Sequence, residues 1–108
     1  MNTETDNFRQ HVIHVIAAIP YGCVVTYGDV AYLAGSARAA RQVGGILRRL
    51  PTGSQLPWHR VINRKGEISL TGPDFQRQKA ALQSEGVIVN SEGKINLEKF
   101  RWRYMQGV

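Results

Sequence analysis

The sequence predicts one mainly α domain across residues 1–108, with a small β element and a helix-turn-helix. Apolar residues recur at helical spacing over 6–19, which predicts the first helix. Two short helices joined by a Gly-Ser turn at 35–36 match a helix-turn-helix in spacing. Apolar segments at 87–89 and 95–97 flank a four-residue turn and predict a β-hairpin. The 43% of apolar residues suffices for one modest core.

Capping residues set the expected bounds of the second and third helices. Thr26 is a favourable N-cap for a helix over 27–34. Ser36 is expected to cap a third helix over residues 37 to about 50, which Pro51 ends.

The second half of the chain has shorter expected elements. A strand is expected over 67–70, and a fourth helix from Gly72 to about Ser84, with proline in its first turn. Residues 100–104 alternate aromatic rings with cations. We expect the rings to pack and the guanidinium groups to lie in solvent, and a binding role is the alternative.

The distribution of charge is one-sided. The net charge is +6, and no acidic residue occurs between Asp29 and Glu67. A segment of this kind is typical of a face that binds a polyanion, because each cation that neutralises a phosphate releases counterions. The alternative is a solvated surface that favours solubility. The segment contains seven cations: Arg38, Arg41, Arg48, Arg49, Arg60, Arg64 and Lys65.

The predicted third helix is rich in small residues, including Gly44 and Gly45. Glycine inside a helix costs on the order of 1 kcal/mol relative to alanine. A helix tolerates this where something must approach its backbone closely. Tight packing against a neighbouring helix is the alternative, and it explains one glycine more easily than two.

Several classes of function are disfavoured by composition. No apolar run approaches the roughly 20 residues that a membrane span needs. The first six residues are acidic and polar, unlike a signal peptide. The single cysteine, Cys23, forms neither an internal disulfide nor a metal cluster. We therefore expect a cytoplasmic protein that uses no metal and no cofactor.

Five motifs in order carry a resemblance to a known family. They are Ile-Pro-Tyr-Gly at 19–22, Thr-Tyr-Gly at 26–28, Ala-Ala-Arg-Gln-Val-Gly-Gly at 39–45, Pro-Trp-His-Arg-Val-Ile at 57–62 and Ser-Glu-Gly at 84–86. Their order resembles the C-terminal domain of O6-alkylguanine-DNA alkyltransferases over about residues 8–90. The resemblance implies a winged-helix-like fold.

Within this resemblance, Trp58 stands where the enzymes have their nucleophilic cysteine. An indole has no thiolate and cannot accept an alkyl group as that cysteine does. The pattern resembles the alkyltransferase-like proteins. It implies a non-catalytic sensor that binds O6-alkylguanine in duplex DNA through the minor groove. Such a sensor flips the damaged nucleotide into a pocket and flags it for nucleotide excision repair.

The resemblance also implies roles for individual residues. Arg41 matches the arginine that fills the gap left by the flipped nucleotide, and Tyr27 matches the tyrosine that rotates that nucleotide. The implied lesion pocket comprises Tyr27, Pro57, Trp58, His59, Ser69, Leu70 and Glu85. The implied DNA-binding set comprises Thr26, Tyr27, Arg38, Ala39, Ala40, Arg41, Gln42, Gly44, Gly45, Arg48 and Arg49.

His59 and Glu85 match the pair that deprotonates the cysteine through water in the enzymes. Here the pair is expected to remain hydrogen bonded and to support the pocket wall. The asparagine hinge of many of the enzymes aligns with Leu50, and their pocket-closing loop aligns only loosely with 66–72. The loss of that loop's tyrosine is expected to widen the pocket for larger adducts.

The expected partners are duplex DNA containing O6-alkylguanine and nucleotide excision repair proteins, with the protein a monomer associated with the nucleoid. A sequence-specific helix-turn-helix regulator is a second hypothesis. Such a regulator needs long polar residues to read the major groove, and the small residues at 39–45 argue against them. A working alkyltransferase is a third hypothesis, which Trp58 opposes. Cys23 as a displaced nucleophile lacks a neighbouring histidine or lysine in the sequence.

Overall fold

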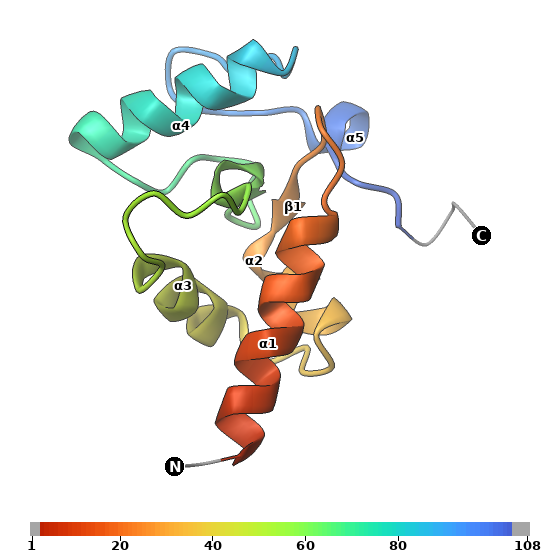
Figure 1. Cartoon of the computed structure of the whole chain (residues 1–108). Helices are drawn as coiled ribbons and strands as arrows, with labels where there is room; N and C mark the ends of the chain where they lie inside the picture. Colours follow the sequence, from red (N-terminus) through yellow and green to blue (C-terminus); the bar gives the residue numbers. More distant parts are fainter. Residues whose placement is uncertain (1–2, 105–108) are drawn as a thin grey trace.

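A computed structural model describes residues 3–104, and Figure 1 shows its arrangement. Helix α1 (Thr3–Ala18) runs along the centre of the view, with α2 (Tyr27–Leu33) and α3 (Ala40–Arg48) beside it. Helix α4 (Gly72–Ser84) lies at the far end of the molecule from the N-terminus. The predicted mainly α fold with a helix-turn-helix and a small β element is confirmed.

The β element is a two-stranded parallel sheet. Strand β1 (Val25–Thr26) pairs with β2 (Val61–Ile62), and Val25 lies opposite Val61. A short 3-10 helix, η1 (Trp58–Arg60), leads directly into β2. Because the paired residues Val25 and Val61 are 36 positions apart in the chain, no local periodicity in the sequence predicted this sheet.

The sheet separates two groups of buried residues. The first cluster joins α1, α2 and α3 and includes Val12, Val30 and Val43. The second cluster lies between α4 and the C-terminal segment and includes Leu82 and Ile95. Neighbouring strand residues point to opposite faces, so Val61 packs into the first cluster and Ile62 into the second.

Helix α2 begins as predicted. The Thr26 hydroxyl accepts a hydrogen bond from the Asp29 N–H at 3.0 Å, and the Asp29 carboxylate accepts one from the Thr26 N–H at 3.0 Å. This reciprocal pair is a capping box. The predicted fourth helix is also confirmed, with Thr71 as its N-cap and Pro73 in its first turn.

The predicted start of the third helix is wrong. Helix α3 begins at Ala40, and Ser36 does not cap it. Instead the Ser36 N–H donates to the Ala31 carbonyl, and the Ser36 carbonyl accepts from the Ala39 N–H. These backbone bonds hold 36–39 as the turn after α2, so the serine cannot serve as the first residue of the next helix.

The predicted hairpin and the strand at 67–70 are also wrong in their pairing. The turn at 90–93 forms, with the Gly93 N–H donating to Asn90. However, the segment after it pairs with residues 66–68, through one isolated bridge between Glu67 and Lys94. Residues 87–89 are not part of that ladder, and the side chains of Val87 and Val89 are buried in the second cluster.

The C-terminal segment was only partly predicted. A one-turn helix, α5 (Leu97–Phe100), was not expected. Trp102 packs against the first cluster, as expected for the tail's rings. The guanidinium of Arg101, which was expected in solvent, instead forms an ion pair with the buried carboxylate of Asp29. No helix among residues 3–104 is long and apolar enough to cross a membrane.

Candidate nucleic-acid interface

The start of α2 is held rigidly from within the protein. Thr26 is only 5% exposed, and its hydroxyl accepts the hydrogen bond that caps the helix. Arg101 Nε donates to Asp29 at 3.0 Å and ties the C-terminal segment to the same cap. Burial raises the pKa of Asp29, but the hydrogen bonds from Arg101 and Thr26 outweigh it and leave the pKa lowered. Thr26 therefore positions Tyr27, and its own side chain is not available to DNA.

A broad basic cavity of about 850 Å³ lies between α1 and α3. It gathers eight residues of the predicted DNA-binding set, including Arg41, Arg48 and Arg49, whose side chains are exposed. Helix α1 adds Arg9 to this lining. The sequence did not point to Arg9, because a single cation on an amphipathic helix usually belongs to its solvated face. The predicted members that line it are Arg38, Ala39, Ala40, Arg41, Gln42, Gly45, Arg48 and Arg49.

The two glycines of α3 are not explained by packing inside the protein. A Cβ at Gly44 would lie 4.0 Å from the Tyr27 ring and 3.8 Å from the Arg48 guanidinium. A Cβ at Gly45 would meet only the Arg49 side chain, at 3.6 Å. These are ordinary contact distances, so the alternative of tight helix packing is wrong. Both positions would accept alanine from within.

A second cavity, of about 550 Å³, lies between α3 and α4 and is called the base pocket below. Four of the seven predicted pocket residues line it: Tyr27, Trp58, Ser69 and Leu70. The Tyr27 hydroxyl is 3.4 Å from the Ser69 hydroxyl, so this pair links the start of α2 to the segment before α4 within the lining. The remaining lining residues are Gly44, Leu47, Arg48, Val61, Asp74 and Gln78.

The other three predicted pocket residues, Pro57, His59 and Glu85, do not line the base pocket. Pro57 is the N-cap residue of η1 and precedes Trp58 in the chain. His59 meets the edge of the Trp58 indole, with ring centroids 6.2 Å apart and planes at 89°. His59 therefore packs against the Trp58 ring, and its hydrogen-bond partner Glu85 lies outside the cavity lining with it.

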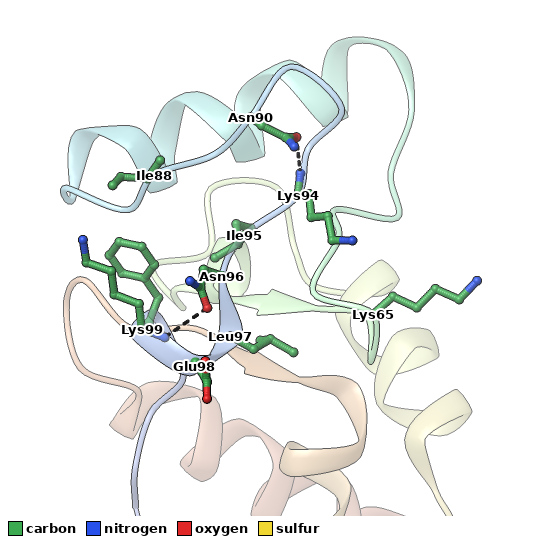
Figure 2. A pocket seen from close by; sticks show the side chains of 10 residues that line it. Lys65, Ile88, Asn90, Lys94, Ile95, Asn96, Leu97, Glu98 and Lys99 are labelled. Atoms are coloured by element: carbon green, nitrogen blue, oxygen red, sulfur yellow. Dashed lines mark hydrogen bonds between the residues drawn. The ribbon is translucent and has the colours of Figure 1, made fainter.

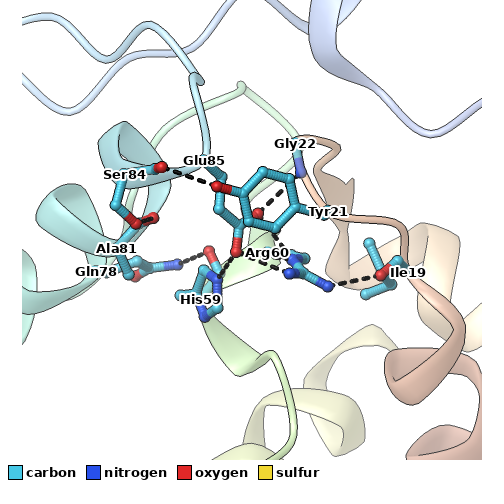
Figure 3. Close-up of polar contacts among 9 residues, drawn as sticks. All are labelled: Ile19, Tyr21, Gly22, His59, Arg60, Gln78, Ala81, Ser84 and Glu85. Atoms are coloured by element: carbon cyan, nitrogen blue, oxygen red, sulfur yellow. Dashed lines mark hydrogen bonds and ion pairs between the residues drawn. The ribbon is translucent and has the colours of Figure 1, made fainter.

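A polar network centred on Glu85 holds this region in place (Figure 3). His59 Nε2 lies 2.6 Å from Glu85 Oε2, and Arg60 donates to the same carboxylate at 2.8 and 2.9 Å. The Gly22 N–H adds a fourth contact at 2.9 Å, and Arg60 also donates to the Ile19 carbonyl at 2.7 Å. The network thus joins η1, α4 and the turn after α1.

The charge state of Glu85 follows from these contacts. Burial raises its pKa, but the hydrogen bonds from Arg60, Gly22 and His59 outweigh burial and lower the pKa to about 2. The carboxylate is therefore ionised at neutral pH. The predicted His59–Glu85 hydrogen bond is present, and the same carboxylate pairs with the largely buried guanidinium of Arg60.

Gln78 is a structural residue that sequence reasoning missed. Its carboxamide nitrogen donates to the carbonyls of His59 and Val61, both at 3.0 Å. A side chain only 2% exposed on α4 thereby fixes η1 and the start of β2. Its polar character concealed it, because a glutamine in a helix most often faces solvent.

Two further cavities adjoin these surfaces. One of about 260 Å³ shares Leu47, Trp58 and Asp74 with the base pocket and extends to the loop at 51–54. Another, of about 690 Å³, is lined by residues between Ile88 and Phe100 together with Lys65 (Figure 2). The latter contains none of the predicted site residues.

The motifs, fold and pocket together define a known class of protein. Residues 7–87 match the model for the DNA-binding domain of 6-O-methylguanine DNA methyltransferase. The chain therefore belongs to the 6-O-methylguanine DNA methyltransferase family.

Within this family, the chain is 66% identical over 99 residues to the DNA base-flipping protein of Escherichia coli K12, covering 92% of this chain and 77% of the relative. It is 40% identical over 104 residues to alkyltransferase-like protein 1 of Schizosaccharomyces pombe, covering 91% and 96%. The crystal structure of S. pombe Atl1 with damaged DNA containing O6-carboxymethylguanine matches with a TM-score of 0.82 and 40% identity, over 95% and 99% of the two chains.

Proposed function

We propose that this protein binds duplex DNA containing O6-alkylguanine, holds the flipped nucleotide in the base pocket and transfers no alkyl group. The observation that carries the proposal is the junction of the two cavities. Arg48 lines both the basic cavity and the base pocket, and the α3 glycines lie beside them. A duplex that follows the cations of α3 therefore lies at the entrance to a pocket large enough to hold a base.

The pocket is suited to a purine that carries an apolar substituent. Its walls include the large rings of Tyr27 and Trp58 and the aliphatic side chains of Leu47, Val61 and Leu70. Stacking of a base on an aromatic ring contributes about 1–3 kcal/mol. That range is comparable with the few kcal/mol needed to extrude a damaged, poorly paired base.

The family resemblance supplies the proposed path of the nucleotide. Tyr27 rotates the nucleotide out of the duplex, and Arg41 fills the vacant position in the stack. The α3 backbone enters the minor groove, where Gly44 and Gly45 permit close approach. Because alanine would fit at both positions without a clash inside the protein, the close approach of DNA is the better explanation for the two glycines.

The absence of alkyl transfer follows from the chemistry of the pocket wall. Trp58 offers no thiolate, and His59 is hydrogen bonded to Glu85. Cys23 is half-buried and packs against the first cluster, so it does not line the base pocket. The bound lesion then remains in place for recognition by nucleotide excision repair proteins, with a monomer of this chain on nucleoid DNA.

Two measurements on the same samples test this function. The first is the dissociation constant for one duplex with and without a single O6-methylguanine, at one salt concentration. We expect at least tenfold tighter binding to the damaged duplex. Equal binding would instead favour a helix-turn-helix regulator.

The second measurement is the intact mass of the protein after prolonged incubation with the damaged duplex. We expect no change in mass. A gain of one methyl group at any residue would establish a working alkyltransferase and overturn the non-catalytic assignment.

A further inference from the structure

Asp74 occupies an unusual position between two cavities. It lines the base pocket and also the adjoining cavity of about 260 Å³, as Trp58 does. Among the described residues, it is the single carboxylate in either lining. A substituent that extends past the Trp58 indole, from one cavity toward the other, therefore passes close to a negative charge.

The charge of Asp74 is balanced from one side only. Arg77, three residues later on α4, forms an ion pair with Asp74 and lines the smaller cavity but not the base pocket. Both side chains are well exposed, at 57% for Asp74 and 71% for Arg77, so water weakens their attraction. The carboxylate consequently retains a negative field on the base-pocket side.

Arg48 is the other charged residue of the base-pocket lining, and its position gives it a different role. It belongs to α3 and also lines the basic cavity that faces the proposed duplex. DNA phosphates neutralise a cation placed there. Asp74 has no such counter-charge in the DNA, and its partial pairing with Arg77 lies on the side of the smaller cavity, so Asp74 is the charged group left in the base-pocket lining once DNA is bound.

We propose that Asp74 makes the base pocket select O6 substituents by charge, admitting neutral and cationic groups and disfavouring anionic ones such as carboxymethyl. The proposal rests on the proposed function, because it concerns the substituent of the flipped base. The crystal structure of the related S. pombe Atl1 contains DNA with O6-carboxymethylguanine, so the proposal concerns relative affinity and not exclusion of this group.

The test compares two substituents of similar size, of which one is anionic and the other is neutral. Dissociation constants are measured for duplexes with O6-carboxymethylguanine and with O6-(2-hydroxyethyl)guanine, at one low salt concentration. We expect the carboxymethyl duplex to bind about three- to tenfold more weakly to the natural protein, as repulsion between partly screened charges predicts. The ratio of the two constants is the quantity of interest.

Two variants shift that ratio in opposite directions. Asp74→Asn removes the charge with little change in shape and should bring the ratio close to one. Arg77→Gln removes the balancing cation and should raise the ratio further. Glu92→Gln is the matched control, because it changes the net charge equally at an exposed residue outside both cavity linings. It should leave the ratio unchanged.

The outcomes separate this inference from the function on which it rests. If the hydroxyethyl duplex binds no better than an undamaged one, the proposed function fails. If it binds better but Asp74→Asn leaves the ratio unaltered, the lesion-binding function stands and the charge selection is overturned. An equal shift in the Glu92→Gln protein would also overturn it, since net charge would then be the cause.

Discussion

At the scale of single residues, the arginines of α3 divide into different environments. Arg41 and Arg49 line the basic cavity only, whereas Arg48 also lines the base pocket. The family resemblance placed Arg48 and Arg49 together in the implied DNA-binding set. The structure makes Arg49 the better control for a plain phosphate contact, because its removal leaves the lining of the base pocket intact.

We expect Arg41→Ala to weaken binding to damaged DNA by about ten- to a hundredfold, or roughly 1–3 kcal/mol. Its effect on undamaged duplex should be smaller, because the unflipped complex has no gap for the guanidinium to fill. Arg49→Ala should weaken both complexes alike, as a phosphate contact does. The measurement is the ratio of the two dissociation constants for each variant. An unchanged ratio in Arg41→Ala would make Arg41 an ordinary phosphate contact.

Glu85 makes the stability of the protein sensitive to acid. Its pKa is about 2 in the folded protein against an ordinary value of 4.5, so its contribution is fully present above about pH 5. That contribution is lost as the pH falls toward 2, and it amounts to about 3 kcal/mol for a shift of this size. Urea denaturation at several pH values measures it.

Glu85→Gln provides the comparison for this acid effect. The variant should be less stable at pH 7, because the buried guanidinium of Arg60 loses its carboxylate. Its free energy of unfolding should fall less steeply between pH 5 and pH 2 than that of the natural protein. Parallel curves for the two proteins would show that Glu85 is not the titrating group.

Several residues of the site lay beyond sequence reasoning for a physical reason. The motifs identified Tyr27 and Trp58, which line the base pocket. Asp74 and Gln78 carry no motif, and polar residues on a helix ordinarily face water. Only the position of α4 against η1 shows that Asp74 lines the base pocket and that Gln78 donates hydrogen bonds to backbone carbonyls.

At the scale of elements, local signals located helices well and pairings poorly. The capping box at Thr26 fixed the start of α2, and proline in the first turn marked α4. The parallel pairing of β1 with β2 depends on contacts between distant segments, which no short window of sequence contains. The expected hairpin was wrong for the same reason, since the segment after the turn pairs with the distant residues 66–68 and not with 87–89.

Helix α3 allows stability and DNA binding to be separated. We expect Gly44→Ala and Gly45→Ala each to stabilise the protein by up to about 1 kcal/mol, because alanine favours the helix and meets no close contact. The same substitutions should weaken DNA binding by at least several-fold, since in the proposed complex the added methyl would meet the minor groove. Thermal unfolding and duplex affinity are measured on the same preparations.

A matched control lies outside the proposed interface. Gln83→Ala changes an exposed residue of α4 that lines neither the basic cavity nor the base pocket. It should leave the affinity for DNA unchanged. Undiminished affinity in both glycine variants would show that nothing approaches that part of α3 closely.

At the scale of the whole molecule, the basic surface determines how binding depends on salt. Of the seven cations in the acid-free segment, Arg60 is occupied by Glu85, and the other six are exposed. If about four to six phosphates are contacted, the logarithm of the affinity should fall with the logarithm of salt with a slope of roughly −4 to −5. Titration between 50 and 200 mM salt measures this, and a slope near zero would place the DNA on another face.

The division of the buried residues into two clusters has a mechanical consequence for the base pocket. Tyr27 and Leu47 belong to the side packed on the first cluster, and Leu70 belongs to the side packed on the second. The two-residue strands, the Glu85 network and the Arg101–Asp29 ion pair join these two sides. A base bound in the pocket would add a contact to each cluster at once. Capture of the lesion should therefore raise the unfolding temperature of the protein.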